Sequence, residues 1–149
     1  MQRHHILPRQ VLHKGFFQRM LAAIGRDRLA MDDFRTNGLL LPSLEQAAQV
    51  LGLPLHRWPH WRYNGVVIER LGQMEATWHN RQAADPDLAG RELLMRMRLL
   101  QQALRRALMR PGMGLARLNR SDPAWHTVDF SELDAMAEML WTVSEPPTA

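Results

Sequence analysis

The sequence predicts an α+β fold that is mostly helical, with two short strands and about five helices. Three observations favour this class. Most apolar residues recur at the three- and four-residue spacing of one helix face. Two short apolar runs end in proline, at Pro8 and Pro42, which is typical of brief strands. Gly25, Gly52 and the pair Pro111-Gly112 stand where the helical patterns stop.

The first 82 residues are expected to contain both strands. Residues 3–8 predict a strand end or turn, and residues 38–42 predict a second strand. Between them, apolar residues at helical spacing predict a helix that stops at Gly25, and the polar residues 26–37 predict a loop. The apolar positions of this helix are Val11, Leu12, Phe16, Met20, Leu21 and Ile24.

Two more helices are expected before residue 83. Ser43 and Gln46 form a capping-box pattern, which predicts a short helix that ends near Gly52. A longer helix should begin within His56–His60, because Pro59 is tolerated in a first turn, where its missing N–H has no partner. The apolar face of this helix continues through Val67, Leu71, Met74 and Trp78.

Residues 83–149 are predicted to be a helical extension of residues 1–82, within a single domain that spans residues 1–149. Asp85-Pro86 looks like a helix N-cap followed by a first-turn proline, so a long helix should start there. Its arginines can be interpreted as a rail for DNA phosphates or as the solvated face of an amphipathic helix. These arginines are Arg91, Arg96, Arg98, Arg105, Arg106 and Arg110.

The last part of the chain is expected to be partly irregular. Residues 112–128 are rich in loop-forming residues, Ser131 is a candidate cap for a final helix, and the tail from Ser144 should fray.

Composition excludes several kinds of site. The chain has no cysteine, so disulfides and thiolate metal ligands are excluded. No apolar run is long enough to cross a bilayer, and Arg3-His4-His5 interrupts any signal-peptide pattern, so neither a membrane span nor an export signal is expected. The net charge of +4 is mild, but every basic residue except Lys14 is arginine. Arginine suits phosphate because its planar fork donates two hydrogen bonds at once, although genomic base composition also explains the bias.

Four of the seven histidines form two close groups. His4 and His5 are adjacent, and His56 and His60 are four residues apart, which is about one helical turn. Three imidazoles around a divalent metal leave positions open for water and substrate, as a catalytic metal site requires. A fourth, unliganded imidazole can deprotonate water near neutral pH. Adjacent histidines can supply both roles, because neighbouring side chains point to opposite sides of a strand.

The order of these motifs resembles the His-Me finger (HNH/endonuclease VII) nucleases, and most closely the Ala-His-His branch found in bacterial polymorphic toxins. The resemblance lies in His4-His5-Ile6-Leu7-Pro8, in Asn37 followed by the apolar strand to Pro42, and in the segment from Leu55 to Tyr63 that contains His56 and His60. It covers roughly residues 3–71. The remaining histidines His13, His79 and His126 lack partners at ligand spacing and are interpreted as ordinary residues.

The resemblance implies a ββα-metal finger and a role for each matching residue. His4, His56 and His60 would bind one divalent ion (Mg, Mn, Zn or Ni), His5 would be the general base, and Asn37 would steady the finger and the base. Arg3, Arg57 and Arg62 flank these positions and are candidates to hold the scissile phosphate, although they can also be solvated surface residues.

Two features depart from the family pattern. Arg3 stands where the named branch has alanine, and only three residues precede the histidine pair. Either the first strand is very short, or the chain is a piece of a longer polypeptide.

The function that the resemblance implies is metal-dependent hydrolysis of nucleic acid, with DNA favoured and RNA not excluded. The protein would be the toxin domain of a bacterial antibacterial effector, delivered into the target-cell cytoplasm and neutralised by a cognate immunity protein. One alternative is a non-catalytic module in which the histidines hold a structural metal and the arginines contact nucleic acid or protein. Another is a helical interaction protein whose histidines are incidental.

Overall fold

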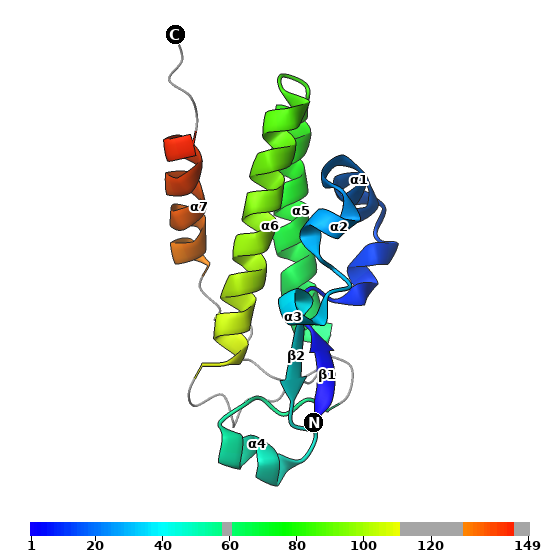
Figure 1. Cartoon of the computed structure of the whole chain (residues 1–149), viewed down its shortest axis with the longest axis vertical. Coiled ribbons are helices and arrows are strands. Elements are labelled where there is room, and N and C mark those ends of the chain that lie inside the picture. Colours follow the sequence, from blue (N-terminus) through cyan, green and yellow to red (C-terminus); the bar gives the residue numbers. More distant parts are fainter. Residues whose placement is uncertain (58–60, 111–129, 145–149) are drawn as a thin grey trace.

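The computed structural model describes residues 1–57, 61–110 and 130–144. Over these ranges the chain is mostly helical with one two-stranded antiparallel sheet, which confirms the predicted α+β, mostly α class. The two longest helices, α5 (Trp61–Gln82) and α6 (Pro86–Leu108), lie side by side, and the sheet lies near the end of this pair that is farther from its connecting turn (Figure 1). None of the helices in the described ranges combines the length and apolar character that crossing a membrane requires.

The sheet pairs β1 (Gln2–His5) with β2 (Gly38–Leu41). His4 lies opposite Leu39, and His5 lies opposite Gly38. Alternation along β1 buries His4 and leaves His5 half-buried on the other face. Both strands lie where they were predicted, although β1 begins and ends earlier than the run of residues 3–8.

Gly38 is required by the close packing of Phe34 at the start of β2. A Cβ atom on Gly38 would lie 2.0 Å from Cδ2 of Phe34, far inside any real contact distance. The ring therefore packs directly on the backbone of the first residue of the strand. This contact fixes the position of α3 (Phe34–Asn37) relative to the start of β2.

The predicted loop over residues 26–37 was wrong. The segment contains two four-residue helices, α2 (Arg26–Leu29) and α3. The carboxylate of Asp33 caps α3 by accepting a hydrogen bond from the backbone N–H of Arg35. Helices this short complete about one turn, so they show no repeating apolar face from which periodicity could predict them.

The helix predicted before Gly25 is divided in two. A 3-10 helix, η1 (Arg9–His13), comes first, and α1 (Gly15–Ile24) follows. Lys14 separates them because its backbone is extended, with φ −85° and ψ 125°. Gly25 ends α1 as predicted.

The prediction that Ser43 caps a short helix was also wrong. Helix α4 (Glu45–Leu51) has Leu44 at its N-cap, and no side chain caps it. The predicted end is confirmed, since Gly52 adopts the left-handed conformation at φ 64° that glycine accepts most readily.

The two long helices largely follow the prediction, with one correction. The helix expected to begin within His56–His60 is α5, which begins at Trp61, and His56 and Arg57 are not helical, so His56 does not lie on that helix. The predicted apolar positions of α5 are buried: Val67, Leu71, Met74 and Trp78. Asp85 caps α6 through a 2.9 Å hydrogen bond from the N–H of Leu88, with Pro86 in the first turn. Pro111-Gly112, the predicted stop, and the loop-rich residues 112–128 lie outside the described residues.

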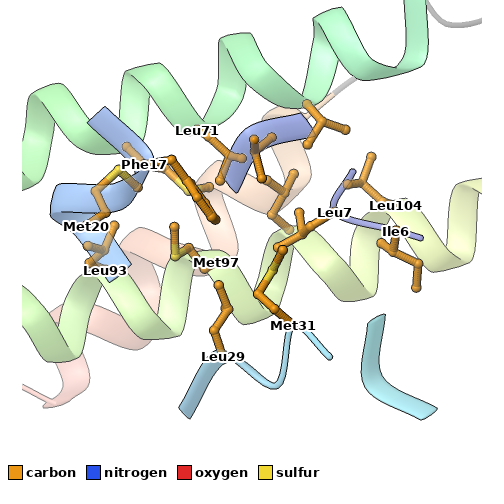
Figure 2. Close-up of a cluster of buried hydrophobic side chains, with 14 of the residues drawn as sticks. Ile6, Leu7, Phe17, Met20, Leu29, Met31, Leu71, Leu93, Met97 and Leu104 are labelled. Atoms are coloured by element: carbon orange, nitrogen blue, oxygen red, sulfur yellow. The ribbon is translucent and has the colours of Figure 1, made fainter. Parts of the chain in front are cut away.

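The hydrophobic core joins the N-terminal elements to α6 (Figure 2). Figure 2 labels side chains from the segments after β1 and after α2, and from α1, α2, α5 and α6, all in one cluster. They are Ile6, Leu7, Phe17, Met20, Leu29, Met31, Leu71, Leu93, Met97 and Leu104. Since all ten are at most 3% exposed, the first 82 residues share their interior with α6 rather than enclosing one of their own.

Helix α7 (Ser131–Ser144), which begins at the predicted Ser131, is joined to the long helices by ion pairs. Arg70 of α5 pairs with Asp134, and Arg96 of α6 pairs with Glu138 at 2.5 Å. Arg96 also pairs at 2.8 Å with Glu92, which is only 2% exposed. One guanidinium therefore bridges a buried carboxylate and the last helix.

Candidate active site

His4 occupies the inner face of β1 and is 3% exposed. Its ring meets the ring of His56 edge to face, with the ring centroids 5.2 Å apart and the planes at 77°. These two predicted metal ligands lie 52 residues apart in the sequence, and the fold brings them together. A pair of imidazoles at this separation is a suitable start for a metal site, because each can turn a ring nitrogen toward a shared ion.

His56 is held from both strands of the sheet. Its backbone N–H donates to the carbonyl of Pro42, directly after β2, at 2.8 Å. Its Nδ1 lies 2.9 Å from Oε1 of Gln2, the first residue of β1. A histidine that binds metal through Nε2 commonly donates its Nδ1–H to an oxygen acceptor, which fixes both tautomer and ring orientation. The arrangement of Gln2 and His56 fits that pattern.

Tyr63 is the third ring of this cluster. Its ring centroid lies 4.9 Å from that of His4, and its hydroxyl donates a 2.5 Å hydrogen bond to the carbonyl of Ile6. Burial raises the pKa of the Tyr63 hydroxyl well above its usual range, so it stays a neutral donor. The bond ties the first turn of α5 to the chain that leaves β1, so helix and sheet keep a fixed relation around His4.

The third predicted ligand, His60, lies outside the described residues. Within the described ranges, no group of three or more residues of ligand type converges on one point. His4 and His56 nevertheless fit a divalent ion by their chemistry, because both are imidazoles and Gln2 orients one of them. A third imidazole from the residue directly before α5 would complete three protein ligands.

His5 lies on the opposite face of β1 from His4 and is half-buried. Burial lowers the pKa of its imidazole, and the positive charges of Arg9 and Arg3 lower the pKa further, while Asp32 opposes them. The lowered pKa favours the neutral imidazole of His5, which is the form that accepts a proton. The strand separates the predicted ligand from the predicted base as expected.

Asn37, the last residue of α3, is fully buried directly before β2. Its Oδ1 accepts from the N–H of Leu7 at 2.7 Å, and its Nδ2 donates to the carbonyls of Leu7 and Met31 at 3.2 and 3.1 Å. Its own carbonyl accepts from the N–H of Ile6. Asn37 therefore holds the backbone of Ile6 and Leu7, the two residues that follow His5.

The three predicted phosphate-binding arginines differ in exposure. Arg3 is exposed on the same side of β1 as His5, with its guanidinium carbon 5.0 Å from the centroid of the Phe34 ring. Arg57, next to His56 in the sequence, is exposed, and Arg62 is half-buried in the first turn of α5.

The sequence did not predict that Gln2 would orient His56. The two residues are 54 positions apart, and a glutamine near an N-terminus carries no signal of its own. The role of Tyr63 was equally hidden, because a tyrosine at a buried helix position is ordinary.

One known protein family matches most of the chain. A model of the AHH family, described as a nuclease family of the HNH/ENDO VII superfamily with conserved AHH, matches residues 1–105. The match includes every predicted site residue and nearly all of α6. Comparisons with curated proteins and with solved structures gave no significant match.

Proposed function

Because the chain belongs to the AHH nuclease family of the HNH/ENDO VII superfamily, we propose that it is a metal-dependent endonuclease that hydrolyses phosphodiester bonds of DNA. The observation that carries the proposal is the meeting of His4 and His56, with their ring centroids 5.2 Å apart, beside His5 on the other face of the same strand. In this proposal β1, β2 and α5 form the ββα-metal finger. Residues 1–149 act as one domain, in which residues 83–149 complete the packing around the finger.

Each residue has a distinct part in the proposed reaction. His4, His56 and His60 would hold one divalent ion, which would stabilise the charge that develops on the phosphate and on the leaving oxygen. A ring nitrogen of His5 takes a proton from water as the water oxygen bonds to phosphorus and the bond from phosphorus to the leaving oxygen breaks. Gln2 fixes the tautomer of His56, and Asn37 fixes the backbone beside His5.

Arg3, Arg57 and Arg62 are proposed to bind the phosphate that is cleaved and its neighbours. Their guanidinium groups can each donate two parallel hydrogen bonds to phosphate oxygens. Support comes from their placement around the histidines, since Arg3 shares a face with His5 and Arg57 is adjacent to His56. RNA has the same phosphodiester chemistry, so the preference for DNA is to be measured with both substrates.

The biological part of the proposal is a bacterial antibacterial toxin that acts in the cytoplasm of a target cell. An immunity protein would neutralise it by covering the histidine site. Support for this part comes from the resemblance to the toxin branch of the family, in the order of the histidine pair, Asn37 and the His-x3-His segment.

A plasmid-nicking assay tests the proposed activity. The purified protein is incubated with Mg, Mn, Zn or Ni, and with EDTA, beside His5→Ala and the control His13→Ala, an exposed histidine of η1. Metal-dependent nicking should fall about 10²- to 10⁴-fold in His5→Ala, the usual contribution of a general base, and persist in His13→Ala. His5→Ala should still bind metal in a calorimetric titration.

Two results would contradict the proposal. A folded wild-type protein that nicks no substrate with any metal, yet binds zinc, would favour the non-catalytic metal-stabilised module. Equal activity of His5→Ala and wild type would remove His5 from the base role.

A further inference from the structure

A second basic site lies away from the histidines, where α2, α3 and α6 meet. It is a pocket of about 330 Å³. The described residues that line it include four arginines, two glutamines and no acidic residue. The arginines are Arg28 of α2, Arg35 of α3, and Arg98 and Arg105 of α6.

Two of the guanidinium groups that line this pocket are held by neutral carbonyl groups rather than by carboxylates. Arg98 donates to the carbonyl of Arg28 at 3.1 Å. Arg105 donates to the carbonyls of Arg35, Thr36 and Gly38 at 2.7, 3.1 and 3.0 Å. The ion pairs within the described ranges involve other arginines, namely Arg19, Arg26, Arg70, Arg81 and Arg96. Carbonyl partners hold Arg98 and Arg105 in place without cancelling their charge.

Asp32 and Asp33, which lie near the pocket residues in the sequence, have other partners, and Asp27 does not line the pocket. Asp32 pairs with Arg26 at 2.9 Å. Asp33 caps α3 by accepting from the N–H of Arg35 and from the hydroxyl of Thr36. Arg28 and Arg35 are exposed, so their guanidinium groups are accessible to a ligand.

The pocket is connected to the candidate active site through Gly38. Arg105 donates to the carbonyl of Gly38, which lies opposite His5 in the sheet. On the other side, the guanidinium of Arg3 lies over the ring of Phe34, the residue that precedes Arg35. Basic side chains therefore extend from the face of β1 that carries His5 toward the pocket.

We propose that this pocket binds a backbone phosphate of the nucleic-acid substrate at a distance from the phosphate that is cleaved. The inference rests on the proposed nuclease function, which makes nucleic acid the polyanion in question. A cluster of guanidinium groups without a carboxylate matches a phosphate in both charge and hydrogen-bond geometry. A second contact of this kind would fix the direction of the strand across the histidines without reading its bases.

Binding without turnover tests the pocket. The affinity of a short labelled DNA duplex is measured by fluorescence anisotropy in EDTA, over a series of salt concentrations. The variant Arg28→Gln/Arg35→Gln removes the two pocket arginines whose guanidinium groups are exposed, and it leaves the carbonyls that hold Arg98 and Arg105 in place. The matched control Arg91→Gln/Arg106→Gln removes two arginines of α6 that do not line the pocket.

The pocket variant should bind the duplex about tenfold more weakly, and the slope of log affinity against log salt should fall by about one for each phosphate that is no longer bound. The control should keep the wild-type slope. Equal losses of affinity in the two variants would overturn the proposal, because the effect would then be one of net charge alone. The proposal would also be overturned if the pocket variant lost affinity for polyglutamate as selectively as it lost affinity for DNA. That result would indicate a site for acidic protein surfaces.

A separate activity assay tests the proposed nuclease function independently of the pocket. Wild-type protein and His5→Ala are compared on bis(p-nitrophenyl) phosphate with metal, a substrate too small to extend beyond one phosphodiester. Absence of metal-dependent hydrolysis by a folded wild type would refute the proposed chemistry, whereas the duplex measurement in EDTA would still decide whether the pocket binds nucleic-acid phosphate.

Discussion

At the scale of single residues, the candidate site depends on side chains that act through the backbone. The side chain of Asn37 forms three hydrogen bonds of 3.2 Å or less to main-chain groups while fully buried, and none of these three is to an imidazole. Tyr63 similarly donates to the carbonyl of Ile6. Both hold the short segment that leaves β1, so the orientation of His4 and His5 is set from outside the strand.

Asn37→Ala should therefore lower the free energy of unfolding by about 3 kcal/mol. The substitution leaves the N–H and C=O of Leu7 and the C=O of Met31 buried without the amide that now pairs with them, and each such group is costly. Urea denaturation followed by circular dichroism measures the change.

Asn64→Ala is the matched control. The Nδ2 of Asn64 donates to the side chain of Gln10 at an exposed position, so a change of about 0.5 kcal/mol or less is expected. Comparable losses of stability in the two variants would contradict the role assigned to the buried amide.

At the scale of elements, the sequence predicted the helices that have a repeating apolar pattern and missed those that are too short to have one. The long apolar patterns predicted α5 and α6, because these helices bury a continuous face, and the apolar run before Pro42 predicted β2. The run before Pro8 predicted a strand end or turn, and its apolar residues Ile6 and Leu7 follow β1 rather than belonging to it. The four-residue helices α2 and α3 are too short to show a period. Ser43 formed a plausible cap that the chain does not use, since α4 begins two residues later.

The candidate site was likewise predictable only where a local sequence pattern exists. The spacing of the histidines identified His4, His5 and His56, and the fold places the rings of His4 and His56 in contact. Contacts between segments more than fifty residues apart, such as Gln2 with His56 or Arg105 with Gly38, have no local pattern and become visible only in three dimensions.

Two glycine-to-alanine substitutions should have opposite effects on element stability. Gly38→Ala puts a methyl group 2.0 Å from Cδ2 of Phe34, so it should lower the free energy of unfolding by about 2 kcal/mol. Gly65→Ala lies within α5 with no atom within 4 Å of the new Cβ, so it should raise the free energy of unfolding by about 0.8 kcal/mol. Urea midpoints of both variants check the signs, and a tolerated Gly38→Ala would show that Phe34 moves aside easily.

At the scale of the whole molecule, a charge network joins three helices. Glu92 is 2% exposed and receives Arg81 of α5 and Arg96 of α6, while Arg96 also reaches Glu138 of α7. Two cations converge on one buried carboxylate, so removing that carboxylate would leave their positive charge poorly compensated near the turn that joins α5 to α6.

Glu92→Gln should lower the free energy of unfolding by about 3 kcal/mol, because it breaks a buried pair from one side only. Glu75→Gln is the control, since its partner Arg19 is 63% exposed and such a pair contributes less than about 1 kcal/mol. Hydrogen exchange adds a local measurement: amides 131–144 should exchange faster in Glu92→Gln. An unchanged exchange rate in α7 would show that the charge network does not stabilise this helix.

The core that joins the segment after β1 to α1, α5 and α6 also orders events during synthesis. The groups that hold the histidine pair at residues 4 and 5 in place lie much later in the chain, including Leu104 in the core and Arg105 on the carbonyl of Gly38. The ribosome therefore makes this pair about a hundred residues before it makes these groups. The candidate site cannot be arranged until most of α6 has been synthesised.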